Sequence, residues 1–165
     1  MTKTLILMRH AKSDWDDPKL DDHDRPLNKR GRRSAIALGN WLRDSGWMPD
    51  QALVSTATRT GQTFELLNIA VPVAFRRGLY HASPDQMLKH LTEVESDTVL
   101  MIGHNPGIAT FANALVQKWP DHERFLDYPT GSTLVVQFDA DRWDQIQPGT
   151  GVVLDFVIPR ELPKV

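Results

Sequence analysis

The chain has 165 residues, of which 41% are hydrophobic and 24% are charged, and its formal net charge is −2. This length fits one domain over residues 1–165 with a sizeable core, and the near balance of charge gives no reason to expect nucleic acid as a partner. The absence of cysteine excludes disulfides, thiolate metal sites and a cysteine nucleophile.

The start of the chain, MTKTLILMRH, has too short an apolar run for a signal peptide, and no stretch approaches the roughly 20 apolar residues that cross a bilayer. We therefore expect a soluble cytoplasmic protein without a membrane partner. The sequence leaves the oligomeric state open.

Apolar segments rich in β-branched residues predict six strands. In chain order these are Lys3–Met8, Ala52–Ser55, Val71–Phe75, Thr98–Ile102, Thr133–Phe138 and Val152–Ile158. The turn-rich residues 139–151 join the last two segments, which predicts an antiparallel hairpin at the C-terminal end of the sheet.

Helical patterns separate most of these strands. They cover Lys29–Ser45, Thr60–Asn68, Pro84–Val94 and Pro106–Gln117. Asn28 is placed to cap the first helix and Gly46 to end it, while Pro106 stands in a first turn, where its missing N–H costs nothing. Strands that alternate with helices predict an α/β fold, in which helices flank both faces of a mostly parallel sheet.

Residues suited to phosphate chemistry follow three of the predicted strands. Arg9 and His10 come directly after the first, Arg59 begins the helix after the second, and His104 follows the fourth within GHNP. Each group alone also fits a structural role, as a solvated loop, a helix-covering surface side chain or a backbone turn. Ligands of open α/β sheets bind beyond the carboxyl ends of the strands, so their convergence at one rim favours a functional site.

These residues resemble the pattern of the histidine phosphatase superfamily, which has the phosphoglycerate mutase-like fold. The resemblance rests on RHA after the first strand, SxxxRTxQT at Ser55–Thr63, and GHNP. RHAKSDW, DRPLNKRG at Asp24–Gly31 and GLYHAS at Gly78–Ser83 are similar to the small SixA-type phosphohistidine phosphatases. The similarity covers most of the chain, to about Phe138.

The resemblance implies a nucleophilic histidine at His10, phosphate ligands at Arg9, Arg59 and His104, and neither a metal nor another cofactor. The chemistry agrees, because a guanidinium fork matches two phosphate oxygens and stays charged. A neutral imidazole must attack, so we predict that a backbone carbonyl in the loop after His10 accepts the Nδ1 proton and leaves Nε2 free. His104 is expected to be a cation when phosphate is bound.

Further polar residues have two readings each. Ser13 fits either a phosphate cradle or a simple turn, and Arg25 fits either a third arginine at the mouth or a partner of the acidic loop Asp14–Asp24. Asn105 fits a helix cap or a substrate contact. Many superfamily members carry a carboxylic acid after the third strand, whereas RRGLYHASPD offers only His81 or Asp85 as a substitute.

Two charged stretches need their own explanation. The loop Asp14–Asp24 lacks the glycine and glutamate of a calcium loop, which favours a solvated segment that lies either open or over the site. KRGRR at Lys29–Arg33 opposes the helix dipole, so either loop carboxylates offset these charges or they face an acidic partner.

The leading hypothesis is a metal-independent phosphohistidine phosphatase that acts on a phosphorylated protein through a covalent phosphohistidine intermediate. A phosphatase for small phosphate monoesters on the same fold is the nearest alternative. The alternative from another class is a phosphate-binding or phosphoryl-carrier module without turnover, whose label on His10 would be stoichiometric.

Overall fold

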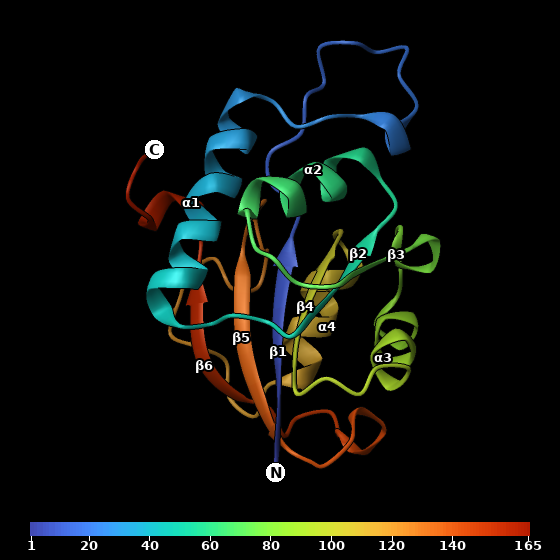
Figure 1. The fold of residues 1–165 in the computed structure, drawn as a ribbon, viewed down its shortest axis with the longest axis vertical. Coiled ribbons are helices and arrows are strands. Elements are labelled where there is room, and N and C mark those ends of the chain that lie inside the picture. The colour runs from blue at the N-terminus through green and yellow to red at the C-terminus, as the bar shows by residue number, and fades with distance from the viewer.

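A computed structural model describes all of residues 1–165 and contains one sheet in the order β3-β2-β4-β1-β5-β6 (Figure 1). The strands are β1 (Thr2–Arg9), β2 (Gln51–Ser55), β3 (Val73–Arg76), β4 (Thr98–Gly103), β5 (Thr133–Asp139) and β6 (Val152–Val157). The first four are parallel, β5 is antiparallel to β1, and β6 is antiparallel to β5. This arrangement confirms the predicted mostly parallel sheet with its C-terminal hairpin.

Helices cover both faces of the sheet, with α1 and α2 on one side and α3 and α4 on the other (Figure 1). They are α1 (Lys29–Ser45), α2 (Thr58–Leu67), α3 (Pro84–Thr92) and α4 (Gly107–Leu115), together with the short 3-10 helices η1 (Asp22–Asp24), η2 (Arg77–Leu79), η3 (Trp143–Gln145) and η4 (Pro159–Glu161). No helix is both long enough and apolar enough to cross a membrane.

The continuous apolar run in β1 follows from this layering. Alternate strand residues face opposite sides of a sheet, so Ile6 and Met8 enter the core beneath α1 and α2 while Leu5 and Leu7 enter the core beneath α3 and α4. All of these side chains are fully buried. The central strand therefore holds its carboxyl end, which carries Arg9, in a fixed position.

Helix α1 has the predicted bounds and α4 does not. The Asn28 side chain accepts a hydrogen bond from the Gly31 amide at 2.8 Å, and Gly46 ends α1 with φ 75°. The prediction of a helix over Pro106–Gln117 is wrong at both ends. Pro106 is the residue before the first turn, and the chain leaves α4 at Val116, which is extended and forms a β-bridge with Gly151.

The loop after β1 is fixed by both helices on its face. A side chain at Gly31 would overlap the Lys12 carbonyl, so glycine allows α1 to pack directly on this loop. On the other side, the Ala11 amide donates to Oγ1 of Thr63 in α2 at 3.1 Å. The backbone on either side of residue 11 is therefore anchored before any ligand is considered.

A buried tyrosine completes the ladder between β1 and β5. Leu7 and Leu134 are partners in that ladder. The Tyr128 hydroxyl donates to the Leu7 carbonyl and accepts from the Leu134 amide at 3.1 Å, and the side chain is fully buried. Loss of this hydroxyl leaves both backbone groups without that partner in a place that water does not reach.

We expect Tyr128→Phe to lower the free energy of unfolding by about 1–3 kcal/mol, because two buried polar groups lose their shared partner. Urea unfolding followed by circular dichroism measures the change. Ser45→Ala is the control, since it removes a hydroxyl on an exposed side chain and should change stability by no more than about 0.5 kcal/mol. Equal losses in the two variants would show that the bridge contributes nothing specific.

Candidate active site

Four of the residues predicted from the strand ends meet in one cluster. Arg9 ends β1 and His10 follows it, Arg59 lies in the first turn of α2, and His104 follows β4. The rings of His10 and His104 have centroids 5.3 Å apart, and Nη2 of Arg59 lies 3.3 Å from Nδ1 of His104. His10, Arg59 and His104 are each no more than 5% exposed.

His10 is held as a neutral imidazole with a defined tautomer. Its amide donates to the Gly103 carbonyl of β4 at 3.1 Å, and Nδ1 lies 2.7 Å from the Ala11 carbonyl. A carbonyl can only accept, so Nδ1 carries the proton and Nε2 bears the lone pair. Burial, opposed by the Ala11 hydrogen bond and assisted by the nearby arginine charges, lowers the pKa of His10 to about 3. The predicted Nδ1 hydrogen bond is confirmed.

Arg59 is tied to the same loop through Thr63. Oγ1 of Thr63 donates to the Arg59 carbonyl at 2.7 Å and accepts from the Ala11 amide. The guanidinium donates from Nη1 to the Asp22 carbonyl at 2.6 Å and from Nη2 to Oδ2 of Asp22 at 3.0 Å. Thr63 therefore fixes the spacing between the helix that carries Arg59 and the loop that carries His10.

His104 is also neutral in this arrangement. An arginine can only donate, so Nδ1 of His104 accepts from Arg59 and Nε2 carries the proton toward Oγ of Ser55 at 2.8 Å. Burial, with the neighbouring His10 and Arg59, lowers the pKa of His104 to about 2. Its expected cationic form with bound phosphate stays a prediction, and it requires Nδ1 to give up the Arg59 contact.

Arg9 brings a second positive charge that is only partly satisfied. Nη1 donates to the Tyr128 carbonyl at 3.1 Å, while Nε is buried without a hydrogen-bond partner. Burial and the charge of Arg59 lower the pKa of Arg9, which places the two guanidinium groups within range of mutual repulsion. The cluster can therefore hold a small anion, whose charge would relieve that repulsion and whose oxygens would accept from Arg9 and Arg59.

A second layer of polar side chains lies against this cluster. Oδ2 of Asp22 accepts from the Tyr80 hydroxyl at 2.5 Å and lies 3.2 Å from Nε2 of His81. Burial acts to raise the pKa of Asp22, but the hydrogen bonds from Tyr80 and Arg59 outweigh it and lower that pKa to about 2. The rings of Tyr80 and His81 lie 5.3 and 5.4 Å from the ring of His104.

Sequence reasoning assigned no role to Asp22. It is one of six aspartates between positions 14 and 24, and no local spacing separates it from the others. Its contacts reach Arg59, Tyr80 and His81, which lie 37 to 59 residues away in the chain. His81, by contrast, was a candidate, and the structure places it beside the cluster.

Ser13 and Arg25 make their contacts within the loop. Arg25 donates to the carbonyls of Asp17 at 3.1 Å and Leu20 at 3.3 Å, and its guanidinium lies 4.1 Å from the centre of the Trp15 ring. Oγ of Ser13 accepts from the Trp15 indole at 3.0 Å. None of these hydrogen bonds goes to the four clustered residues. The observed contacts therefore fit a turn role for Ser13 and a role for Arg25 within the acidic loop.

Asn105 supports the cluster from one side. Its Nδ2 donates to the carbonyls of Asp127 at 3.0 Å and Tyr128 at 3.1 Å, and its Oδ1 accepts from the Ala109 amide at 3.2 Å. The Tyr128 carbonyl is also the acceptor of Arg9. Asn105 thus caps α4 and shares a backbone acceptor with Arg9. No group of three or more His, Cys, Asp or Glu side chains is arranged to hold a metal ion.

The chain matches a known family pattern and is similar in sequence to known proteins. The sequence pattern of the histidine phosphatase superfamily (branch 1) matches residues 5–83. An uncharacterized protein of Mycobacterium tuberculosis is 36% identical over 160 residues, which is 93% of this chain and 100% of that protein. An uncharacterized chloroplastic protein of Arabidopsis thaliana is 35% identical over 131 residues, covering 70% of this chain and 60% of that protein.

Solved structures give the same family. A candidate phosphohistidine phosphatase SixA from Nakamurella multipartitia has 31% identity and a TM-score of 0.84, with 96% of this chain and 97% of that chain covered. A second candidate SixA, from Agrobacterium tumefaciens, has 25% identity and a TM-score of 0.78, with 95% and 98% covered. The protein histidine phosphatase SixA complexed with tungstate shares the fold, with 21% identity, a TM-score of 0.77 and 95% and 97% covered.

Sheet order, the residues at the strand ends and both kinds of similarity therefore agree that this chain belongs to the histidine phosphatase superfamily and, within it, to the SixA type.

Proposed function

We propose that this chain is a phosphohistidine phosphatase that acts on a phosphorylated protein, with His10 as the nucleophile and without a metal. The observation that carries this proposal is the neutral His10 ring, whose Nδ1 proton is held by the Ala11 carbonyl while Nε2 keeps its lone pair beside two arginines. The SixA-type family membership supports the same reaction.

The first step transfers the phosphoryl group to the protein. The Nε2 lone pair of His10 forms a bond to phosphorus, and the P–N bond of the substrate breaks with its electron pair left on the substrate ring. Negative charge is spread over the three transferring oxygens in this transition state, and Arg9 and Arg59 stabilise it by charge and by position. His104 is the remaining donor for a phosphoryl oxygen.

The second step releases phosphate. A water oxygen forms a bond to phosphorus, the Nε2–P bond breaks, and the electron pair returns to Nε2 while the water proton goes to solvent. Because the Ala11 carbonyl keeps the Nδ1 proton in place, phosphorylated His10 is a cationic ring that leaves as neutral imidazole. One hydrogen bond therefore prepares the nucleophile in the first step and the leaving group in the second.

The absence of a carboxylic acid near the cluster favours a P–N substrate over an ester. Asp22 is the nearest carboxyl group, and a pKa of about 2 keeps it ionised at neutral pH, so it cannot supply a proton to an alcohol leaving group. A phosphorylated imidazole that carries a proton on its other nitrogen leaves as neutral imidazole without such help. This difference separates the proposal from a phosphatase for small phosphate esters.

His10→Ala should abolish turnover of a phosphohistidine peptide, and Arg59→Ala should lower kcat/KM by about 10²- to 10³-fold because one charged donor to the transition state is lost. Rapid quench with ³²P-labelled substrate should trap label on His10, followed by its release as phosphate. Lys118→Ala and Arg142→Ala, which change exposed positions away from the cluster, should retain full activity.

Three results would change the assignment. Activity in His10→Ala would remove the proposed nucleophile. Label that accumulates to one equivalent without release would identify a phosphoryl carrier. Faster turnover of sugar or nucleotide phosphates than of the phosphohistidine peptide would identify a phosphomonoesterase.

EDTA should leave the rate unchanged, because the two guanidinium charges take the part that a divalent ion has in other phosphatases. The measurement compares initial rates on phosphohistidine peptide before and after EDTA treatment and dialysis, with metal content checked by mass spectrometry. Inhibition that one divalent ion reverses would show that the metal-independent mechanism is wrong.

His10 and His104 should remain unprotonated in the folded chain from pH 7 to about pH 4, since their pKa values are lowered to about 3 and about 2. In the unfolded chain both titrate near pH 6.5. The unfolded state therefore binds more protons below that value, and the free energy of unfolding should fall as the pH drops from 7 toward 4. NMR titration of the histidine ring nitrogens tests this directly, and a midpoint near 6.5 for His10 would contradict it.

A further inference from the structure

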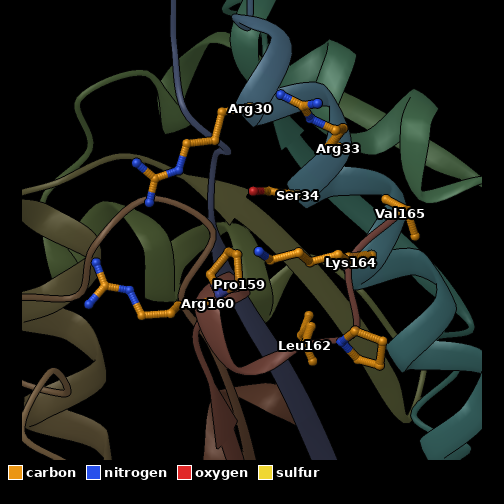
Figure 2. Close-up of a pocket in the computed structure, with 10 residues that line it drawn as sticks. Arg30, Arg33, Ser34, Pro159, Arg160, Leu162, Lys164 and Val165 are labelled. Atoms are coloured by element: carbon orange, nitrogen blue, oxygen red, sulfur yellow. The ribbon is translucent and has the colours of Figure 1, made fainter.

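A basic groove lies beside the candidate active site, between α1 and the segment 159–165 that follows β6 (Figure 2). Its volume is about 460 Å³. Two arginines from α1 and two cations from the C-terminal segment line it: Arg30, Arg33, Arg160 and Lys164. Figure 2 shows the Lys164 ammonium and the Ser34 hydroxyl pointing toward the same space, with the guanidinium groups of Arg30 and Arg160 to the left of it in this view.

The cations of this groove have no carboxylate partners. No ion pair within 4 Å includes Arg30, Arg33, Arg160 or Lys164. The same holds for the remaining basic residues of KRGRR, Lys29 and Arg32, so no loop carboxylate forms an ion pair with this stretch. The aspartates of the preceding loop instead cap turns or contact Arg59. The second explanation for KRGRR, that these residues face an acidic partner, stays open.

This concentration of charge is unfavourable to the folded chain by itself. Four basic residues in the first five positions of α1 oppose the helix dipole, and like charges three residues apart, as at Arg30 and Arg33, repel each other. The chain as a whole is slightly acidic, with a net charge of −2, so the patch is not part of a generally basic surface. A local basic groove on an acidic protein is suited to steering an anionic partner.

The groove and the loop that carries His10 are connected through Gly131. Gly131 donates from its amide to the His10 carbonyl at 2.9 Å, and its Cα lies so close to Pro159 that a side chain at Gly131 would collide with the proline ring. Pro159 is one of the residues that line the groove. Strands β1 and β6 run in the same direction, so their carboxyl ends lie at the same end of the sheet (Figure 1). The groove, which follows β6, therefore lies at the end of the sheet where His10 follows β1.

We propose that this groove binds a carboxylate-rich segment of the phosphorylated protein while its phosphohistidine is at His10, an inference that rests on the proposed function. Carboxylates can reach cations on both walls, and the apolar lining from Ala37, Pro159 and Leu162 suits the aliphatic stems of glutamates. No aromatic residue lines the groove, so it offers no platform on which nucleic acid bases could stack. The groove thus contributes to KM and to partner choice, whereas the cluster around His10 carries out the chemistry.

The first test measures binding without catalysis. A hexaglutamate peptide is titrated into the ¹⁵N-labelled full chain, with inorganic tripolyphosphate as a second probe. We expect the peptide to shift amide resonances of Arg30–Ala37 and Pro159–Val165, and Arg30→Glu/Lys164→Glu to abolish these shifts. Lys89→Glu/Lys118→Glu is the matched control, because it makes the same charge change at exposed residues outside the groove. Shifts from tripolyphosphate alone, or peptide shifts that survive in the groove variant, would overturn the proposal.

The second test measures turnover of two phosphohistidine peptides of equal length, one with a hexaglutamate tail and one with a hexaserine tail. At about 50 mM salt, the groove variant should lose roughly tenfold in kcat/KM on the acidic peptide, through KM, and nothing on the neutral one. The loss should shrink at about 0.5 M salt, where charges are screened within a few ångströms. The control variant should match wild type on both peptides.

The outcomes separate the two proposals. If neither peptide is turned over, the proposed function fails, while the NMR titration still decides whether the groove binds carboxylates. If both peptides are turned over but the groove variant loses equally on both or on neither, the docking proposal is wrong and the phosphatase stands.

Discussion

The hydrogen bond between Nδ1 of His10 and the Ala11 carbonyl is the interaction on which the site depends. It is a local contact, but its geometry is set by long-range structure. The sheet fixes the His10 amide on Gly103, and Thr63 of α2 fixes the Ala11 amide. The Ala11 carbonyl belongs to the next peptide plane, which it shares with the Lys12 nitrogen, and the packing of α1 at Gly31 on Lys12 restrains that plane. Together the two anchors keep the carbonyl directed at the ring. The rigid packing around β1 therefore selects a single tautomer of the His10 imidazole.

Backbone carbonyls, more than carboxylates, organise the positive charge. Arg9 is held by the Tyr128 carbonyl and Arg59 partly by the Asp22 carbonyl, while Asn105 positions residue 128. A carbonyl orients a guanidinium without cancelling its charge, so the charge of Arg9 is preserved, whereas Arg59 also pairs with the Asp22 carboxylate. Burial, assisted by these positive charges, lowers the pKa values of the neighbouring imidazoles and keeps them neutral. Burial and charge together thus place two neutral imidazoles beside two charged guanidinium groups.

The parts of this protein that could be predicted from sequence are those encoded by local pattern. Apolar runs located every strand, and the rule that ligands bind at strand ends brought His10, Arg59 and His104 together before the structure did. Asp22 could not be found in this way because its partners come from three distant segments. Arg25 had two readings because the sequence does not tell how a loop folds onto its own carbonyls. The basic groove likewise depends on where residues 159–165 pack.

Asp22 occupies both outer nitrogens of Arg59, Nη1 through its backbone carbonyl and Nη2 through its carboxylate. An incoming anion that needs those nitrogens must displace a group tethered to the same chain, which behaves as a competitor at an effective concentration of millimolar order. Asp22 therefore lowers the affinity of the cluster for any anion that uses Arg59, and it can return to these nitrogens when the anion leaves.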